Sequence, residues 1–448
     1  MNSPNSKRAI VAVIGLGRVG LPLATLLALR GFNVVGYDVD QNRIHKLVNG
    51  DPGFYERDLE PLLHEATRSG RVSFTSDGNL LRTVDVPIIT IGTPWNEQSM
   101  KPDLSQLDAA VDTLGAVLKK EAVVILKSTV APGTTEKRVV TRLEALSKFA
   151  LGKDFGIAFS PERMIEGQAV SDYENLPKII GASDDRSFEV ASKVLGALGG
   201  RVLRVSSPRA AEMVKMLDNY NRDGSIALIN QFALICMQAS LDVLEVINAA
   251  KFHYPRNQGL LIPGGGVGGS CLNKDPWILS HFAQEHGVQA PLISTFRSVN
   301  SNMPGQVVAL TERMLARFGL SKPKLVVAGL AFKSGTDDIR YSPGITVAKR
   351  LLAQNHEVTV SDPYVRLISN TELNTAPIPN IIEASTGSNV VIFMSDHDEY
   401  RSLDLKLLRE RMGSPAGLVD ARHVINPKQA LSIGFDFEGI GRPREAYA

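Results

Sequence analysis

The chain has 448 residues, more than one core of ordinary size contains, so two or three domains are expected. Hydrophobic residues make up 44% of it and charged residues 21%, a balance that is typical of folded globular proteins and favours neither disorder nor a membrane protein. The formal net charge is +2 and the basic residues are scattered, so nucleic acid is not an expected partner.

The cysteine count and the N-terminus indicate the compartment. Cys236 and Cys271 are the only cysteines, which argues against a disulfide framework or a metal site built from thiolates and is typical of a reducing compartment. Lys7 and Arg8 precede an apolar run that Gly15 interrupts, and this run is too short for a signal peptide or a membrane span. We therefore expect a cytoplasmic protein with no membrane partner and no metal.

The first 38 residues predict a dinucleotide-binding unit. The apolar run 10–14 predicts a strand, residues 21–29 a helix, and residues 33–37 a second strand. Between the first strand and the helix stands Gly15-Leu-Gly-Arg-Val-Gly20, and Asp38 ends the second strand. Glycines at this spacing allow pyrophosphate to approach a helix N-terminus, while the acidic residue accepts from a ribose hydroxyl and repels a 2′-phosphate. The pattern favours NAD over NADP.

Further strands are predicted at residues 86–91, 122–126 and 155–159. Each of these apolar runs is followed by small or polar residues, among them Thr93, Thr129 and Glu162. Buried runs separated by helical stretches are typical of a parallel sheet. We expect these side chains to line the carboxyl edge of that sheet.

The middle of the chain changes character. Residues 208–284 carry long helical patterns with few breakers, notably at 211–247, which predicts a linker and the core of a dimer. From residue 324 the alternation returns, with strands predicted at 325–328, 358–361 and 390–394 and a helix near 345–354. Residues 355–362, which end at Asp362, echo residues 31–38, and this predicts a second doubly wound domain.

A glycine-rich segment carries the reactive groups. Residues 264–275 read Gly-Gly-Gly-Val-Gly-Gly-Ser-Cys-Leu-Asn-Lys-Asp, which predicts a flexible loop that presents backbone N–H groups to negative charge. Cys271 would be a thiolate nucleophile there, with Lys274 and the backbone N–H groups favouring its negative charge. The alternative is a glycine-rich turn with a small buried residue.

Four polar residues share one face of the predicted central helix. Glu212, Lys215, Asn219 and Arg222 are spaced i, i+3, i+7 and i+10. One interpretation is a solvated face, with Glu212 and Lys215 as an ordinary pair and Asp218 supporting Arg222. The other is that Lys215 and Asn219 stabilise an oxyanion close to Cys271.

The ordered set of motifs resembles the nucleotide-sugar 6-dehydrogenases, which include UDP-glucose, GDP-mannose and UDP-N-acetylhexosamine dehydrogenases. The motifs that carry this resemblance, from about residue 9 to beyond residue 420, are Gly15-x-Gly-x-x-Gly20, Ser128-Thr129-Val130, Pro161-Glu-Arg163, Glu212-x-x-Lys215-x-x-x-Asn219, Gly268-Gly-Ser-Cys271 with Lys274-Asp275, Ala331-Phe-Lys333 and Asp337-Asp-x-Arg340-x-Ser-Pro343. The resemblance implies two Rossmann-like domains joined by a long helix and a central helical dimerisation domain. The expected domains are residues 1–205 for NAD, 206–305 for dimerisation and the catalytic cysteine, and 306–448 for the UDP-sugar.

Members of this family oxidise the sugar C6 alcohol to a carboxylate in two NAD-dependent steps. The resemblance implies that Cys271 carries the thiohemiacetal and the thioester, and thiolate chemistry agrees, because a second hydride leaves only after a nucleophile adds to the aldehyde. Lys215 and Asn219 would hold the C6 oxygen, with Asp275 positioning water or taking a proton. Glu162 would be the acid or base of thioester hydrolysis.

The resemblance also implies the binding residues. Thr129 would orient the water or the nicotinamide. The residues expected at NAD are Gly15, Gly17, Arg18, Val19, Gly20, Asp38, Arg43, Thr93, Thr129, Lys274 and Arg340. The residues expected at the UDP-sugar are Arg163, Met164, Lys215, Asn219, Arg222, His253, Arg256, Gly268, Phe332 and Lys333.

The substrate signals point to two branches of the family. Features that resemble the UDP-N-acetylmannosamine branch are Val267, Arg222-Asp223, His253, Pro255-Arg256 and Asp275-Pro-Trp277. Ser270 and Lys274 resemble the UDP-glucose branch, and Arg18, Glu166 and Asn273 depart from residues that are common in the family. We therefore expect a UDP-N-acetylhexosamine dehydrogenase. The alternatives are a UDP-glucose 6-dehydrogenase, a single-step hydroxyacid dehydrogenase, and a regulator that binds NAD or a nucleotide sugar without catalysis.

Overall fold

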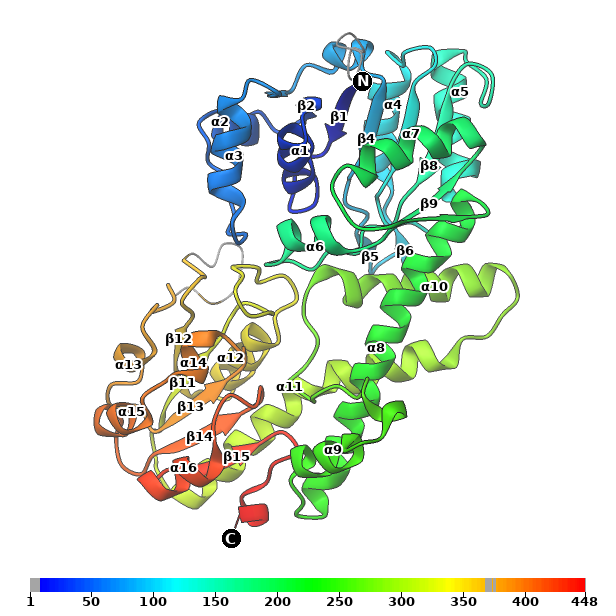
Figure 1. The fold of residues 1–448 in the computed structure, drawn as a ribbon. Helices are drawn as coiled ribbons and strands as arrows, with labels where there is room; N and C mark the ends of the chain where they lie inside the picture. The colour runs from blue at the N-terminus through cyan, green and yellow to red at the C-terminus, as the bar shows by residue number, and fades with distance from the viewer. Residues whose placement is uncertain (1–8, 367–372, 374–375, 448) are drawn as a thin grey trace. The chain divides into compact units, whose positions relative to one another are not determined.

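The protein consists of two compact units. The computed structural model describes residues 9–366, 373 and 376–447, so Lys7 and Arg8 lie outside the described residues. One unit contains Met1–Asp218 and Trp277–Val288, and the other contains Asn219–Pro276 and Gln289–Ala448. Figure 1 shows a sheet flanked by helices in each unit, which confirms the predicted pair of α/β domains. The domain limits predicted at residues 205 and 305 stay a prediction.

The N-terminal unit is built on an eight-stranded sheet, in the order β10-β9-β8-β7-β4-β1-β2-β3. The strands from β3 to β8 in this order are parallel, as the apolar runs predicted. The strand β9, which was not predicted, pairs with β8 in the antiparallel direction, so the whole sheet is mixed. The strands are β1 (Ile10–Ile14), β2 (Asn33–Tyr37), β3 (Val72–Thr75), β4 (Val86–Ile89), β7 (Val123–Leu126), β8 (Gly156–Phe159), β9 (Lys178–Ala182) and β10 (Val202–Val205).

Helices cover both faces of this sheet. Alternate residues of β1 point to opposite faces, so Val11 and Val13 belong to one core and Ala12 and Ile14 to another. The first core includes residues of α1 (Gly20–Leu29), α3 (Leu59–Arg68) and α7 (Asp185–Gly196), and the second includes residues of α4 (Ser105–Gly115) and α5 (Thr141–Ser147). The remaining elements of this unit are α2 (Gln41–Val48), α6 (Ala169–Asn175), η1 (Gly78–Thr83), η2 (Thr135–Val140) and the hairpin β5 (Trp95–Asn96) and β6 (Lys101–Pro102).

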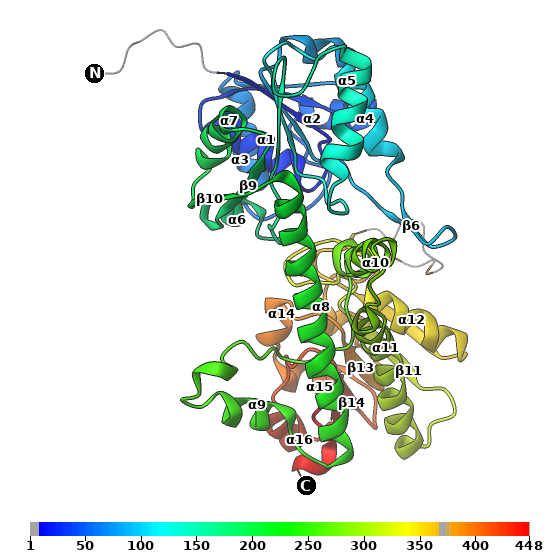
Figure 2. The same cartoon turned by 90° about the vertical axis from the view of Figure 1, so that its right-hand side faces the viewer.

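The central helix is shorter than the sequence predicted. α8 is Pro208–Gln238, and a separate helix, α9 (Val243–Lys251), follows it, as Figure 2 shows. The predicted continuous helix over 211–247 is wrong because Ser240 has φ +55° and Asp242 caps the new helix by accepting from the Leu244 N–H at 2.8 Å. Two further long helices are α10 (Ser270–Glu285) and α11 (Pro291–Phe318).

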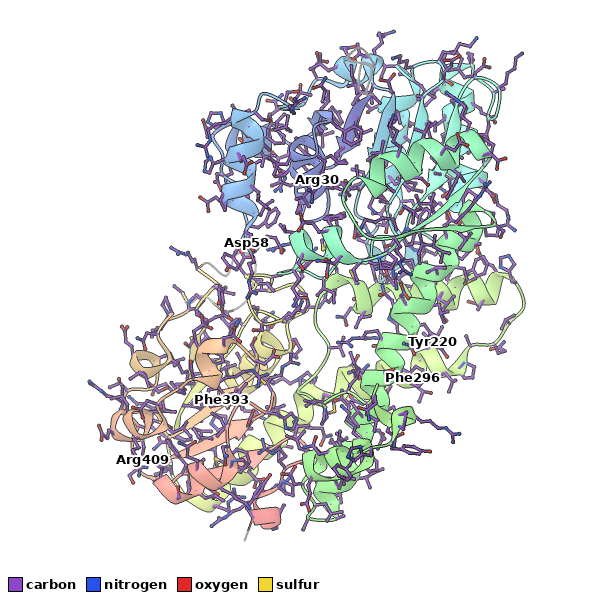
Figure 3. The ribbon with its side chains drawn as sticks, in the orientation of Figure 1. Arg30, Asp58, Tyr220, Phe296, Phe393 and Arg409 are labelled. Carbon is purple, nitrogen blue, oxygen red and sulfur yellow. The ribbon has the colours of Figure 1, made fainter. Side chains whose placement is uncertain are left out.

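α8 and α11 pack through an aromatic contact. The rings of Tyr220 and Phe296, both labelled in Figure 3, have centroids 5.9 Å apart. Gly224 makes this approach possible, since a Cβ built on it would lie 2.7 Å from the Phe296 ring. The contact fixes the part of α8 that carries the polar residues next to Asn219.

The C-terminal sheet has five parallel strands in the order β12-β11-β13-β14-β15. Three of them confirm predicted strands, and the apolar residues of β11 again alternate between two cores. The strands are β11 (Lys324–Ala328), β12 (Glu357–Ser361), β13 (Val390–Phe393), β14 (Gly417–Asp420) and β15 (Asp436–Gly439). The helices are α12 (Pro343–Ala353), α13 (Ile381–Ala384), α14 (Asp398–Arg401), α15 (Leu405–Arg411), α16 (Pro427–Ile433), and the short turns η3 (Pro255–Asn257) and η4 (Arg444–Tyr447).

Candidate active site

The glycine motif forms the turn between β1 and α1. Gly15 has φ +94°, a conformation that favours glycine, and a Cβ built on Gly20 would lie 1.9 Å from the Gly15 carbonyl oxygen. These two glycines are therefore required by the fold. Gly17 differs, because it is exposed and no atom lies within 4 Å of a Cβ built on it. An open backbone at the start of a helix fits the pyrophosphate of a dinucleotide.

Asp38 is tied to this turn. Its carboxylate accepts from the Leu16 N–H at 2.8 Å and from the Asp40 N–H at 3.0 Å. The side chain is half-buried, and a carboxylate has about four acceptor positions, so capacity remains for ribose hydroxyls. The residues present thus fit NAD at this motif.

Two arginines of the predicted NAD set share an aromatic ring that sequence reasoning missed. The guanidinium carbons of Arg18 and Arg43 lie 4.9 Å and 5.5 Å from the centroid of the Phe54 ring. Arg43 also donates from Nε to the Leu16 carbonyl at 2.5 Å, and burial lowers the pKa of Arg43. Arg43 therefore braces the glycine turn and stands next to Asp38, the carboxylate that is predicted to bind the ribose.

The sheet edge brings the predicted threonines together. The Thr93 hydroxyl donates to the Thr129 carbonyl at 2.5 Å, and Thr93 is buried. A further residue, Thr90, was missed by the sequence analysis and donates to the carbonyls of Ile14 and Gly15. The carboxyl ends of β1, β4 and β7 thus meet at one edge, as parallel strands require.

Glu162 lies in a buried cluster of charged and polar groups. Its carboxylate accepts from the N–H groups of Arg163 and Met164, each at 2.9 Å, and from the Tyr173 hydroxyl. Lys127 Nζ lies 3.4 Å from Glu162 Oε2. Burial opposes ionisation, but Lys127 and the Tyr173 hydrogen bond together hold the pKa of Glu162 below its ordinary value. The arrangement favours the ionised form of Glu162, and its role as an acid or base stays a prediction.

Tyr173 and Lys178 make further contacts in the cluster around Glu162. Tyr173 also donates to the carbonyl of Val19 at 3.2 Å, which links the glutamate to the glycine motif. Burial and the adjacent Glu162 raise the pKa of Tyr173 well above its ordinary value. Lys178 donates to the carbonyls of Tyr173 and Leu176, and burial lowers the pKa of Lys178 to about 8. Lys127, Tyr173 and Lys178 carry no motif, so sequence reasoning missed them.

The polar face of α8 is not the solvated stripe of the first interpretation. Glu212 is fully buried and accepts from the Gly133 N–H, the Thr135 N–H and the Thr135 hydroxyl. Burial raises the pKa of Glu212 to about 7. Asp218 pairs with Arg163 at 2.7 Å, and it thereby holds a residue that we expected at the substrate. The first interpretation, in which Asp218 supports Arg222, is therefore not what the structure shows.

Cys271 is exposed at the second residue of α10. The expected flexible loop therefore ends at Gly269, because Ser270 to Asp275 form the first turns of a helix in place of loop. This correction strengthens the chemical argument, since the backbone N–H groups and the dipole at a helix start favour a negative charge on sulfur.

Asp275 lies one turn beyond Cys271 and is buried. It accepts from the Asn219 amide through Oδ2 and from Lys274 Nζ through Oδ1. The structure thus brings together three residues of the predicted set, two from α10 and one from α8. Lys215 is buried on α8, one helical turn before Asn219.

A buried network holds both ends of the glycine-rich segment. Asn273 donates to the carbonyls of Val267 and Gly269 at 3.2 Å and 2.8 Å, and accepts from Arg297. Arg297 pairs with Asp223 at 2.8 Å, and both side chains are buried. The connection continues through Asn300 to Asn230, and the side-chain Oδ1 of Asn230 accepts from the Gly264 N–H at 2.9 Å. Long-range contacts build this network, so the motifs alone did not reveal it.

The double glycine packs against Phe332 from the loop after β11. A Cβ on Gly268 would lie 2.3 Å from the Phe332 Cβ, and a Cβ on Gly269 would lie 2.8 Å from its ring. The Gly269 N–H also donates to the Arg340 carbonyl at 2.9 Å, and Asp338 binds the Arg340 guanidinium. The predicted residues Gly268, Phe332 and Arg340 are therefore neighbours within one unit.

Three predicted substrate residues are exposed. Arg222 lies on α8, while His253 and Arg256 lie on the turn that follows α9. His253 has φ +48° and stacks edge-on against Phe252 with ring centroids 4.4 Å apart. Their role in binding a sugar stays a prediction.

Across the described ranges, none of the helices combines the length and the apolar character of a membrane span.

Three domains of one protein family match the chain in order. The NAD binding domain of the UDP-glucose/GDP-mannose dehydrogenase family matches residues 9–198, and its central domain matches residues 209–302. The UDP binding domain of the same family matches residues 326–427. The presence of the NAD binding domain makes NAD the cofactor, in agreement with the geometry of Gly17 and Asp38.

Known proteins resemble the chain over almost its whole length. A UDP-N-acetyl-D-mannosamine dehydrogenase of Pyrococcus horikoshii is 34% identical over 96% of this chain and 99% of that relative, and an NDP-N-acetyl-D-galactosaminuronic acid dehydrogenase of Ralstonia solanacearum is 31% identical over 94% and 97%. The solved structure of the Pyrococcus protein superposes with a TM-score of 0.87, covering 97% of this chain and 99% of that one. A UDP-glucose dehydrogenase from Pyrobaculum islandicum superposes equally well, with a TM-score of 0.87, 30% identity and coverage of 98% and 99%. The chain therefore belongs to the UDP-glucose/GDP-mannose dehydrogenase family of NAD-dependent nucleotide-sugar dehydrogenases.

Proposed function

We propose that the chain oxidises the C6 alcohol of a UDP-N-acetylhexosamine, with UDP-N-acetylmannosamine favoured, to the uronate. The observation that carries this proposal is the exposed Cys271 at the start of α10. Lys274 and Asp275 follow it in the same helix, and Asp275 accepts from Asn219 of α8. An accessible sulfur gives an aldehyde a nucleophile to react with, which a one-step alcohol dehydrogenase does not need. NAD, when bound, accepts one hydride in each of the two oxidations.

The first oxidation turns the alcohol into an aldehyde. Lys215 and Asn219 hold the C6 oxygen in the proposed mechanism, because an ammonium and an amide donor stabilise its developing negative charge. Asp275 keeps the Asn219 amide oriented by accepting from it, and takes the alcohol proton or orders the water that does. Lys274 donates to the other oxygen of Asp275 and thereby fixes the position of that carboxylate.

Covalent catalysis then prepares the second oxidation. The Cys271 thiolate adds to the aldehyde carbon, and the carbonyl oxygen takes back the proton released in the first oxidation to become the hydroxyl of a thiohemiacetal. Loss of a hydride from that carbon and of the hydroxyl proton leaves a thioester. Water attacks the thioester carbonyl, the carbon–sulfur bond breaks, and the uronate leaves with Cys271 restored. Glu162, kept ionised by Lys127, removes the proton of that water.

The other end of the substrate requires a nucleotide site. The match of residues 326–427 to a UDP binding domain supports a UDP group bound by Phe332 and Lys333. Arg163 and Met164 follow Glu162 directly and are proposed to contact the substrate. Gly268 belongs to the same set because it packs against Phe332.

The sugar is the finer part of the proposal. The relatives from Pyrococcus and Ralstonia are named for N-acetylated sugars, whereas the Pyrobaculum relative is named for UDP-glucose. Arg222, His253 and Arg256 are the proposed contacts to the N-acetyl sugar or its phosphates. A panel of UDP-glucose, UDP-N-acetylglucosamine and UDP-N-acetylmannosamine, assayed by NADH formation, is expected to show highest kcat/KM for the last. Preferred turnover of UDP-glucose would establish the alternative.

A homodimer through the central helices belongs to the same proposal. Leu228, Phe232 and Ile235 follow one another at i, i+4 and i+7 on α8 and expose 60%, 38% and 54% of their surface. Such an apolar stripe fits a second copy of the chain. Light scattering is expected to give a dimer, and Phe232→Asp a monomer. An unchanged mass for Phe232→Asp would contradict this interface.

We propose the cytoplasm as the compartment of the protein, since the chain has only two cysteines.

A further inference from the structure

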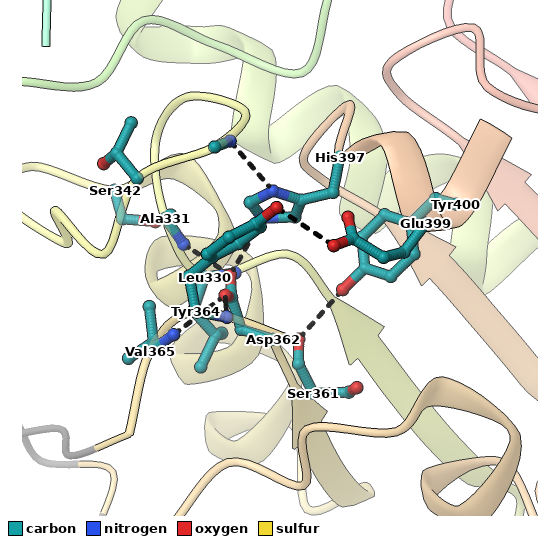
Figure 4. Close-up of polar contacts among 12 residues, drawn as sticks. Leu330, Ala331, Ser342, Ser361, Asp362, Tyr364, Val365, His397, Glu399 and Tyr400 are labelled. Atoms are coloured by element: carbon teal, nitrogen blue, oxygen red, sulfur yellow. Dashed lines mark hydrogen bonds and ion pairs between the residues drawn. The ribbon is translucent and has the colours of Figure 1, made fainter. Parts of the chain in front are cut away.

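The C-terminal domain contains a buried carboxylate whose acceptor positions are filled. Asp362 follows β12 and has 0% exposure. It accepts from five donors, which are the N–H groups of Leu330, Ala331, Tyr364 and Val365 and the imidazole of His397, as Figure 4 shows. Burial opposes ionisation, but the hydrogen bonds from His397 and the backbone hold the pKa of Asp362 below its ordinary value.

The same backbone arrangement occurs at the NAD motif. Gly329 has φ +97° and donates to the Ser361 carbonyl at 2.8 Å, just as Gly15, with φ +94°, donates to Tyr37 at 2.8 Å. The next residue in each domain donates to the acidic residue, since Leu330 binds Asp362 at 2.7 Å and Leu16 binds Asp38 at 2.8 Å. Gly344 corresponds to Gly20 of the first motif, because a Cβ built on Gly344 would lie 2.2 Å from the Gly329 carbonyl oxygen and one built on Gly20 would lie 1.9 Å from that of Gly15. The two segments that each end a strand at an aspartate therefore share the same backbone hydrogen bonds as well as a similar sequence.

The two carboxylates nevertheless differ in availability. Asp38 is half-buried and accepts from two backbone N–H groups, whereas Asp362 has more donors than the roughly four acceptor positions of a carboxylate. A ribose hydroxyl can therefore be accepted at the first motif but not at the second. The carboxylate of the second motif is therefore an internal support for the surrounding backbone.

His397 completes this support from the start of α14. Its Nε2 lies 3.2 Å from Asp362 Oδ2, and its Nδ1 accepts from the Gly335 N–H at 3.3 Å. A backbone donor at Nδ1 assigns the neutral tautomer with the proton on Nε2. His397 thus binds Gly335 directly and Leu330 and Ala331 through Asp362. These contacts fix both ends of the segment that carries Phe332 and Lys333.

The surroundings hold the imidazole in place. The rings of Tyr364 and Tyr400 lie 5.0 Å and 5.3 Å from that of His397. Tyr364 donates to Glu399 at 3.0 Å and Tyr400 donates to the Ser361 carbonyl at 3.4 Å, so each hydroxyl is directed away from the imidazole nitrogens. The two nitrogens of His397 contact Asp362 and the Gly335 N–H.

We propose that His397 is a positioning residue for nucleotide-sugar binding, which fixes the Gly329–Gly335 segment through Asp362 and Gly335. The inference rests on the proposed function, because it assumes that Phe332 and Lys333 contact the UDP group. It assigns no chemistry to His397, and it predicts an effect on KM for the nucleotide sugar and not on kcat.

Two substitutions separate hydrogen bonding from packing. His397→Gln keeps a donor for Asp362 and an acceptor for Gly335, whereas His397→Phe keeps the ring volume and removes both bonds. Calorimetric titration of the full chain with UDP, and separately with NAD, measures the two binding sites. His397→Phe is expected to weaken UDP binding about tenfold or more, because the half-buried Gly335 N–H loses its acceptor and Asp362 loses its imidazole donor, so that the segment between them is no longer tied to α14. His397→Gln is expected to stay within about threefold of wild type.

The NAD titration distinguishes positioning from general destabilisation. NAD affinity is expected to be unchanged in both variants, and KM for the UDP-sugar should rise in His397→Phe while kcat stays constant. Wild-type UDP affinity in His397→Phe, or a parallel loss of NAD and UDP affinity, would overturn the inference. If the wild-type chain itself binds no UDP, the proposed function fails first, so the two failures are distinguishable.

Discussion

Removing the charge of Lys127 is expected to impair thioester hydrolysis at low pH. Lys127 Nζ lies 3.4 Å from Glu162 Oε2, and the lysine side chain is 3% exposed. Two unit charges at about this separation attract by about 4 kcal/mol at an effective dielectric constant near 20. Since this attraction opposes the burial of Glu162, Lys127→Met should raise the pKa of Glu162 and protonate it closer to neutrality.

The direction of the pH effect follows from the sign of that shift. In the wild type the pKa of Glu162 is below its ordinary value, so the base is available throughout the neutral range. In Lys127→Met the acidic limb of the pH–rate profile moves to higher pH, and the hydrolysis rate at pH 6 falls about tenfold or more. The rate at pH 9 should recover towards the wild-type value, because the glutamate is ionised again.

The assay isolates the second oxidation by supplying the C6 aldehyde of the UDP-sugar. Steady-state NADH formation, which continues beyond the first turnover only as the thioester is hydrolysed, is followed between pH 5 and pH 9 for the wild type, Lys127→Met and Lys127→Arg, the last of which keeps the charge. Lys127→Arg is expected to keep an acidic limb close to that of the wild type. A Lys127→Met profile with the wild-type shape, lowered by one factor at every pH, would refute the electrostatic role.

Three further predictions test other parts of the structure. Gly17→Ala should leave the melting temperature unchanged in thermal unfolding and weaken NAD binding about tenfold in a titration. The matched Gly20→Ala should lower the free energy of unfolding by about 1 to 3 kcal/mol. Arg297→Met leaves the buried Asp223 without its cation and should lower the free energy of unfolding by about 3 to 5 kcal/mol. Adding Asp223→Asn should recover much of that loss in chemical denaturation. Burial raises the pKa of Glu212 to about 7 from 4.5, so the folded state binds this proton more tightly and stability should fall by about 3 kcal/mol between pH 4.5 and pH 7. Glu212→Gln should flatten that dependence, and an unchanged slope would contradict it.

Local patterns allowed the sequence to predict much of the fold. The strand at residues 10–14, the glycine turn and Asp38 depend on neighbours within a few dozen residues, and the structure confirms the strand and places Asp38 next to the turn. The break after α8 was missed although Asp242 is a good capping residue, because the apolar pattern continues through it. The helix that begins at Ser270 was missed because a glycine run precedes it and Pro276 lies inside it.

The supporting residues of the candidate site were beyond sequence reasoning. Lys127 and Tyr173 approach Glu162 only because neighbouring elements of the sheet edge meet there. Arg297 and Asp223 are 74 positions apart, and no spacing rule connects α8 with α11. Such pairs depend on tertiary packing, whereas the motif residues that they orient are recognisable from their order along the chain.

The measurement that tests the account most directly is the number of NADH molecules formed per uronate, combined with the state of Cys271. Wild-type protein with the preferred UDP-sugar is expected to form two NADH per uronate, and acid quenching during turnover should leave a mass increase on the Cys271 peptide that corresponds to the sugar thioester. Cys271→Ser should form no uronate. One NADH per sugar, unaffected by Cys271→Ser, would contradict the account and indicate a single-step dehydrogenase, and binding of NAD and UDP-sugar without any NADH would indicate a non-catalytic regulator.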